Sequence, residues 1–173
     1  MQKALRQTLI IIFLSLISSM FLTIVHADQV TLKEGTIIIL KTMDHLTPKD
    51  VSKGDVVKCI VDEDVIVDGS IVIPEGAIAT GDVSSSEEAT FMGQPGKLGI
   101  TAKTVKAIDQ QIVQIRGYLQ KSGKDKTVKA GVIAYICLFG LFMKGEEAVI
   151  PQGSLIRAYV DKTVTIEIEK PKN

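Results

Sequence analysis

The sequence predicts an all-β fold, namely a single antiparallel β-barrel or closed sandwich with a short apolar insertion. Three observations predict it. Short β-branched runs are separated by turn signals at close intervals, and helical periodicity is almost absent. The phrase VIPEGAI at residues 72–78 returns as VIPQGSL at residues 149–155 and, more loosely, as TLKEGTI at residues 31–37. Finally, TVTIEIE at residues 163–169 alternates apolar and polar residues, as a half-buried strand does.

The turn signals divide the chain into successive strands. Asp68-Gly69, between two apolar runs, predicts a tight hairpin with both central residues at positive φ. Residues 52–55 and 108–111 are expected reversals, and the polar stretches 84–96 and 120–126 are expected to be exposed loops. The expected strands are residues 36–43, 55–61, 65–67, 70–73, 77–84, 97–106, 111–119, 154–160 and 163–169.

The repeated phrase aligns on Gly35, Gly76 and Gly153, with similar residue types on either side. Proline would preset φ at the first corner of a type I turn, and glycine would accept the left-handed conformation before the next strand. The phrase therefore predicts a strand-entry corner that is used three times. The residues expected to face the interior after two of these corners are small or apolar: Ala77, Ala79, Gly81, Ile156, Ala158 and Val160.

The first 27 residues have the order of a secretory signal peptide. Lys3 and Arg6 precede the uncharged, mostly apolar residues 8–25, and a small-residue cleavage pattern ends at Ala27. We expect cleavage after Ala27, which would leave residues 28–173 as one β-barrel domain in the periplasm, secreted, or associated with the envelope. An uncleaved N-terminal membrane anchor is the alternative, because the apolar run just reaches membrane-spanning length.

The charge balance limits the class of partner. The 20 basic and 20 acidic residues of the chain cancel, and the loss of Lys3 and Arg6 would leave the mature chain near −2. Because binding to phosphates needs a clustered basic surface, nucleic acid is not expected as a partner. Cys59 and Cys137 both lie in apolar runs, so two buried free thiols or one disulfide closing a long loop are both open.

The segments VIPEGAIATGDV, GKLGITAKTVKAIDQQIVQIRG and AVIPQGSLIRAYVDK, in this order, resemble the TrbI-like β-barrel domain. Members of that family form the channel component of the outer-membrane complex in type IV secretion and conjugation systems. The chain is similar also to short exported bacterial proteins that carry this barrel alone. The residues matching the family's turn and closing strand are Ile73, Pro74, Gly76, Ala77, Gly153 and Asp161, and Asp109-Gln110 stands where the family usually has Asp-Gly.

The resemblance implies a barrel with a helical insertion before its closing strand. The corresponding stretch here runs from Ala130 to Met143, fourteen uncharged residues between Lys129 and Lys144. A buried strand pair or a core helix is one interpretation, and an exposed contact with a membrane or a subunit is the other. The family's cytoplasmic tail and Pro-rich periplasmic arm have no counterpart in this sequence, which puts a channel role in question.

The search for catalytic chemistry identifies no site. His45 is the only histidine after residue 27 and lies in a polar loop, without a nucleophile motif. The acidic cluster at Asp62, Glu63, Asp64 and Asp68 lacks the spacing of a calcium loop, and Glu87-Glu88 is read as solvated. Gly93, Gly96 and Gly99 suggest a phosphate loop only faintly, because no helix follows. No catalytic, cofactor-binding or metal-ligating residue is predicted, and no cofactor is expected.

These observations lead to an exported cell-envelope protein with a structural or assembly role and no enzymatic activity. An envelope protein partner or self-association is expected through the segment from Ala130 to Met143, with membrane contact as a further expectation. Two alternatives stay open. One is an envelope hydrolase that uses two converging carboxylates. The other is a barrel that carries a small ligand in its interior.

Overall fold

The computed structural model describes residues 28–91, 93–125 and 144–168. One compact unit, Gln29–Ile168, contains almost all of them. The predicted signal segment, the apolar segment from Ala130 to Met143 and Cys137 lie outside the described residues.

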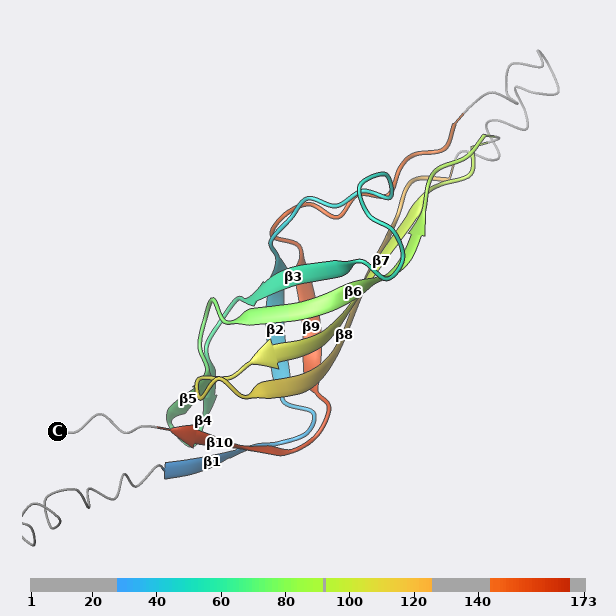
Figure 1. Ribbon diagram of the computed structural model, residues 1–173. Helices are drawn as coiled ribbons and strands as arrows, with labels where there is room; N and C mark the ends of the chain where they lie inside the picture. Colours follow the sequence, from blue (N-terminus) through green and yellow to red (C-terminus); the bar gives the residue numbers. More distant parts are fainter. Residues whose placement is uncertain (1–27, 92, 126–143, 169–173) are drawn as a thin grey trace, which may run out of the picture. The chain divides into compact units, whose positions relative to one another are not determined.

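Six antiparallel strands close into a barrel, which confirms the predicted fold class (Figure 1). Neighbours around the barrel follow one another in the sequence, except that a hairpin is inserted between β3 and β6, and β9 pairs with β2 to close the ring. Closure removes the unpaired strand edges of an open sheet. The barrel strands are β2 (Ile37–Thr42), β3 (Val56–Val61), β6 (Ile78–Glu87), β7 (Lys97–Lys106), β8 (Ile112–Ser122) and β9 (Leu155–Val160).

Two small sheets accompany the barrel. β4 (Val65–Val67) pairs with β5 (Ser70–Ile73), and β1 (Asp28–Leu32) pairs with β10 (Val164–Ile168). Strand β1 was not predicted, because its five residues hold only two buried apolar side chains and its partner lies at the other end of the sequence. Apolar residues from all four of these strands belong to the same buried cluster as the barrel interior.

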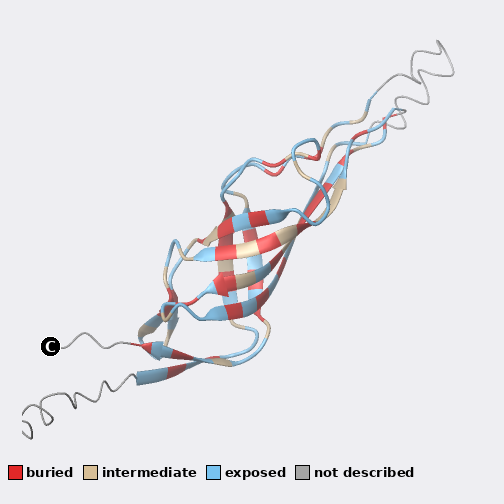
Figure 2. Cartoon of the chain, in the orientation of Figure 1, coloured by how far each residue is buried: buried red, intermediate tan, exposed pale blue. Residues whose placement is uncertain are grey.

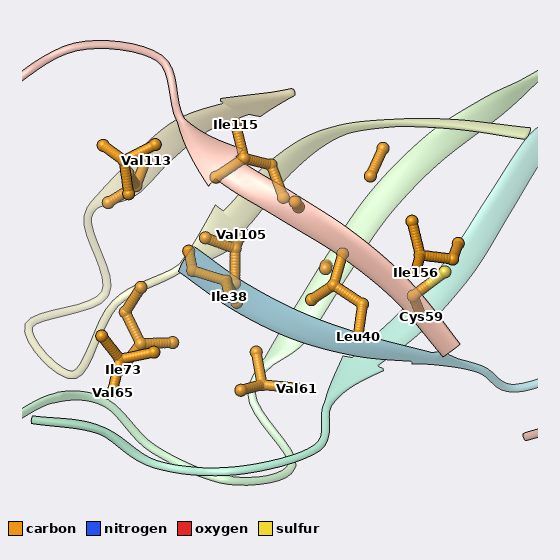
Figure 3. Packing of buried hydrophobic residues seen from close by; sticks show 14 of the residues in the cluster. Ile38, Leu40, Cys59, Val61, Val65, Ile73, Val105, Val113, Ile115 and Ile156 are labelled. Atoms are coloured by element: carbon orange, nitrogen blue, oxygen red, sulfur yellow. The ribbon is translucent and has the colours of Figure 1, made fainter. Parts of the chain in front are cut away.

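The core is built by the alternation of side chains along each barrel strand (Figure 2). Ile38 and Leu40 point inward from β2, and Ile156 meets them from β9 (Figure 3). Thr42 is the only buried polar side chain of the described residues, and its hydroxyl donates to the Pro151 carbonyl at 3.0 Å. Five of the six predicted interior residues are fully buried, and Ala77 is partly buried.

The repeated phrase forms the same corner each time. The glycine has φ of 79° at Gly35, 76° at Gly76 and 81° at Gly153, so the predicted left-handed conformation is confirmed. The prediction of a type I turn is wrong, because positive φ at the third turn residue is type II geometry, and proline occupies the first position. In each copy an N–H donates to the carbonyl three residues earlier: Thr36 to Lys33 at 3.2 Å, Ala77 to Pro74 at 3.1 Å and Ser154 to Pro151 at 3.1 Å.

Each corner also attaches the new strand to the end of an existing one. The glycine N–H donates to the last residue of the neighbouring strand, 2.9 Å in all three copies: Gly35 to Val160, Gly76 to Val61 and Gly153 to Thr42. A fourth corner with a different sequence is similar, since Gly54 has φ of 96° and its N–H donates at 2.8 Å to the Val83 carbonyl, which lies within β6 and not at its end. Four of the six barrel strands therefore begin at one type of corner.

Small residues fill a row across four strands of the barrel. Gly81, Ala102, Gly117 and Ala158 are successive register partners on β6, β7, β8 and β9. A Cβ atom on Gly81 would overlap the Thr101 carbonyl, and one on Gly117 would lie 2.8 Å from the Ala158 Cβ atom. A barrel of six strands is narrow, so small residues on one side make room for the larger aliphatic side chains opposite.

Two loop predictions are wrong at their starts. Residues 84–87 continue β6, paired with Gly99, Leu98 and Lys97, and residues 120–122 continue β8. Ser and Glu have weak intrinsic strand preference, but pairing along the long β7 strand outweighs that preference. These three strands therefore extend beyond the closed part of the barrel (Figure 1).

The two tight turns confirm the predicted reversals. Asp68 and Gly69 have φ of 50° and 77°, as a type I′ hairpin requires. In the β7–β8 turn, the Gln110 N–H donates to the Ala107 carbonyl at 3.0 Å, and Gln110 has φ of 70°. A three-residue hairpin usually has glycine at this last position, so Gln110 carries backbone strain.

Replacing Gly76 or Gly153 with valine should lower the free energy of unfolding by about 1–3 kcal/mol, because a β-branched residue is strained at positive φ. No atom lies within 4 Å of a Cβ built on either glycine, so the cost comes from the backbone alone. Asparagine at the same positions is the control and should cost less, because asparagine tolerates this conformation. Thermal or denaturant unfolding that shows no loss in the valine variants would contradict the corner assignment.

Gln110→Gly should raise the free energy of unfolding by roughly 0.5–1 kcal/mol, since relief of the left-handed strain exceeds the entropy lost by glycine. The matched control is Gln111→Gly, because Gln111 is not among the residues with positive φ. That variant should be destabilised. A loss of stability in Gln110→Gly, measured by denaturant unfolding, would show that the side chain of Gln110 outweighs its backbone strain.

Candidate interaction surfaces

The polar residues considered from the sequence do not converge. His45 is exposed in the loop after β2. In the acidic cluster, Asp62 pairs with Lys41, and Asp64 accepts the Glu75 N–H at 2.7 Å. Within the part of the chain that the structure describes, no group of three or more metal-ligating side chains is assembled. Asp62 and Asp64 thus serve as strand-end and turn contacts.

Cys59 is a free thiol that lies in the barrel core beside Ile156 and Leu40 (Figure 3). Burial raises the pKa of this thiol to about 11, and the negative charge of Asp44 adds to the shift. The thiolate form, which is the nucleophile, is therefore scarce at neutral pH. Cys59 acts as a small apolar residue, one of the two interpretations of the cysteines.

Three glycines tie together the two chain segments that flank the apolar segment. The Gly123 N–H donates to the Gly96 carbonyl, the Gly96 N–H donates to the Glu146 carbonyl, and the Gly145 N–H donates to the Thr90 carbonyl, each at 3.0 Å. We call Gly96, Gly123 and Gly145 with these bonds the neck. The neck places residues 123–125 and 144–146 next to the β6–β7 loop.

The neck requires glycine because its backbones pass closely. A Cβ atom on Gly123 would overlap the Glu146 carbonyl, and one on Gly145 would overlap the Gln94 carbonyl. The glycine-rich stretch QPGKLG therefore reflects a close backbone approach. The sequence itself argues against a phosphate loop here, because no helix follows the glycines.

Glu147 binds the segment after the neck to the β6–β7 loop. One carboxylate oxygen accepts the Ala89 N–H at 2.9 Å, and the other lies 2.9 Å from Lys144 Nζ. The Ala89 hydrogen bond, followed by the interaction with Lys144, holds the pKa of Glu147 below its usual value. The segment then continues to Ile150, which pairs with Leu46.

A shallow groove of about 550 Å³ lies on the outer surface of the barrel. Its lining is aromatic and basic and contains no carboxylate among the described residues. We call it the Tyr-Arg groove, and its lining residues are Thr101, Arg116, Gly117, Tyr118, Arg157 and Tyr159.

The groove forms where two strands separate. The pairing of β8 with β9 ends at Gly117 and Ala158, after only three register pairs. Beyond this point β9 pairs with β2 alone and β8 with β7 alone. Tyr118 and Arg157, the next outward residues on the two strands, therefore line the sides of an opening.

Apolar side chains continue from the groove across the outer face. Tyr159 pairs with Ile37, and Leu155 pairs with Lys41. Ile37 is 52% exposed, Tyr118 56%, Leu155 55% and Tyr159 44%. Exposed Tyr and Arg with aliphatic neighbours are typical of the centre of a protein interface.

The two arginines of the groove differ in whether they form an ion pair with a described residue. Arg116 forms an ion pair with Asp161. Arg157 forms no ion pair with any residue in the described ranges, and its strand neighbours on β2 are apolar or basic. The groove thus offers a cation that an incoming carboxylate can pair with.

Sequence reasoning did not identify this site. The signal was present, because IRGYL and LIRAYV place Arg and Tyr at alternating positions of predicted strands, on the side opposite to the expected interior. The sequence does not specify the register between β8 and β9, and this register decides which outward residues of the two strands become neighbours.

Among residues 28–91, 93–125 and 144–168, no helix has the length and hydrophobicity needed to cross a membrane.

No protein-family model matches the chain, and no curated protein sequence matches it. Among solved structures, the chain is similar to the structure of ComB10 of the Com type IV secretion system of Helicobacter pylori. The two are 11% identical, the match covers 82% of this chain and 92% of that chain, and the TM-score is 0.42. The chain resembles the TrbI-like barrel domain remotely, and its closed barrel has the fold class which that resemblance implies.

Glu147→Gln should lower the free energy of unfolding by about 1 kcal/mol at pH 7, because a charge-assisted hydrogen bond and an ion pair are weakened. Since the pKa of Glu147 is lowered in the folded state, this contribution is present above the unfolded pKa and disappears as the pH falls through the folded pKa. The difference from wild type should therefore begin to shrink as the pH falls below about 4.3, the ordinary pKa of glutamate, and should vanish below the lowered folded pKa. Glu88→Gln, a change at an exposed neighbour, is the control, and a difference that does not vary with pH would contradict the assignment.

Proposed function

We propose that this chain is an exported cell-envelope protein with a structural or assembly role, in which the barrel is a rigid scaffold for a protein partner. The observation that carries the proposal is the Tyr-Arg groove. It combines two exposed tyrosines, an arginine without an ion pair in the described part of the chain, and aliphatic neighbours on one outer face. Interfaces are enriched in these residue types at their energetic centres.

The interior of the barrel supports a scaffold role over a ligand-carrying role. Its inward side chains are aliphatic residues, alanines and the Cys59 thiol, and many have no exposed surface. A carrier of one small molecule would need open space inside its strands. The charged side chains of the barrel strands lie outside, where Lys41 pairs with Asp62 and Lys103 pairs with Asp82.

The proposed role is non-catalytic. An envelope hydrolase would need two carboxylates that share a cleft and have separated pKa values. Asp161, beside the Tyr-Arg groove, pairs with Arg116, and Glu147, beside the neck, pairs with Lys144. This arrangement favours structural use of these acidic groups.

The proposed location is the cell envelope, based on the signal-like residues 1–27 and on the resemblance to the TrbI-like domain. Cleavage after Ala27 belongs to this proposal. The segment from Ala130 to Met143 remains a second proposed contact, and the neck holds the described residues on either side of it together.

Site-specific photo-crosslinking in living cells tests the assembly role. A photoreactive amino acid at Tyr159 should give one discrete adduct with another envelope protein, because this residue is exposed at the centre of the groove face. The matched control places the same group at Lys58, an exposed outward position on β3. Equal labelling at both positions, or no adduct at Tyr159, would contradict a specific partner on this face.

A further inference from the structure

We propose that the edge of β8 beyond the barrel binds an extended, acidic peptide segment of a partner protein as an added β-strand. This proposal rests on the assembly role and specifies the mode of binding. The edge is formed by Leu119 to Ser122, which pair with β7 but have no strand partner on the other side among the described residues. An unpaired strand edge is a template for a further strand.

The direction of the backbone groups on β8 follows from one hydrogen bond. The Asp161 N–H donates to the Gln114 carbonyl at 2.9 Å, so Gln114 directs its carbonyl toward β9. The exposed and buried side chains of β8 alternate without a break past the register shift in its pairing with β7, so Gln120 also directs its N–H and carbonyl to that side. The pairing of β9 with β8 has ended before this point, at Ala158. Among the described residues, nothing bonds to the N–H and carbonyl of Gln120 on this side, so both are open to an incoming strand.

The side chains around this edge specify the chemistry of the occupant. The edge begins at the Tyr-Arg groove, where Tyr118 and Arg157 lie on opposite sides of the opening. A carboxylate on the peptide would pair with Arg157, and an apolar residue two positions away, on the same face of the added strand, would cover the exposed Tyr118 ring. Lys121 on the same strand adds a second exposed cation.

The strand edge distinguishes a peptide from other anionic ligands. Nucleic acid or a lipid headgroup would bind the arginines but would form no hydrogen bonds with the backbone of β8. The chain also has equal numbers of basic and acidic residues, a composition that does not favour a phosphate-rich ligand. A second copy of this chain is less suited, because the edge and the groove are both basic. These other occupants are therefore outcomes of the test.

The test is an NMR titration of the isotope-labelled full chain with a defined probe. The probe is a ten-residue synthetic peptide with threonine at every second position and with glutamate and valine taking turns at the positions between, so that one face of the strand carries both. Its counterpart carries lysine in place of glutamate. The acidic peptide should shift the amide signals of Tyr118 and Gln120 and slow hydrogen exchange at Gln120. The lysine peptide should bind at least tenfold more weakly.

Two pairs of variants separate the backbone and charge contributions. Gln120→Pro removes the edge donor while leaving the β7 side of the strand unchanged, and it should weaken binding at least tenfold. Gln120→Thr loses the same 2.8 Å side-chain bond to Tyr118 but keeps the donor, so it should bind within twofold of wild type. Arg157→Glu should weaken binding at least tenfold, whereas Lys58→Glu, the same charge change on β3, should not. Circular dichroism and the barrel amide signals verify that each variant is folded.

Each result decides the proposal. Binding of the acidic peptide that requires both the Gln120 donor and Arg157 supports strand addition. No binding, equal binding of the lysine peptide, unchanged binding by Gln120→Pro, or self-association in the absence of peptide would overturn it. If the peptide fails while the Tyr159 crosslink persists, the assembly role stands and only the mode of binding is wrong.

Discussion

The constraint on which the structure depends is a hydrogen bond that a glycine N–H at positive φ donates to a carbonyl of a neighbouring strand. It recurs at Gly35, Gly54, Gly76 and Gly153, with N···O distances of 2.8–2.9 Å. At each corner the chain turns and the next strand begins in register with its neighbour. Because Gly35 bonds to the end of β9 and Gly153 to the end of β2, two of these corners lie on the strand pair that closes the barrel.

The narrowness of the barrel determines where interactions with other molecules take place. With six strands, the interior has room only for mixed small and aliphatic side chains, as the row from Gly81 to Ala158 demonstrates. A filled interior stabilises the fold but leaves binding to the outer face.

Both candidate surfaces arise where the strands depart from a regular barrel. β6, β7 and β8 have 10 or 11 residues, whereas β2, β3 and β9 have six each, so the far parts of the three long strands leave the closed wall. One consequence is the neck, in which glycines allow the flanks of the apolar segment to meet the β6–β7 loop. The other is the separation of β8 from β9, which opens the Tyr-Arg groove and leaves the edge at Gln120 unpaired. Regular strand pairing stabilises the barrel, and the two candidate surfaces lie where that pairing stops.

The sequence by itself determined the fold class, most strand positions, the tight turn at Asp68-Gly69 and the left-handed glycines of the repeated phrase. These features depend on local chemistry, because alternation, β-branching and the freedom of glycine act within a few residues. The turn type was mistaken, since type I and type II turns accept the same proline and glycine signals at different positions. The Tyr-Arg groove, the neck and the β1–β10 pair were decided only by the tertiary structure. Each depends on the register between strands that are distant in the sequence, and the residues of a single strand do not encode which neighbour they meet.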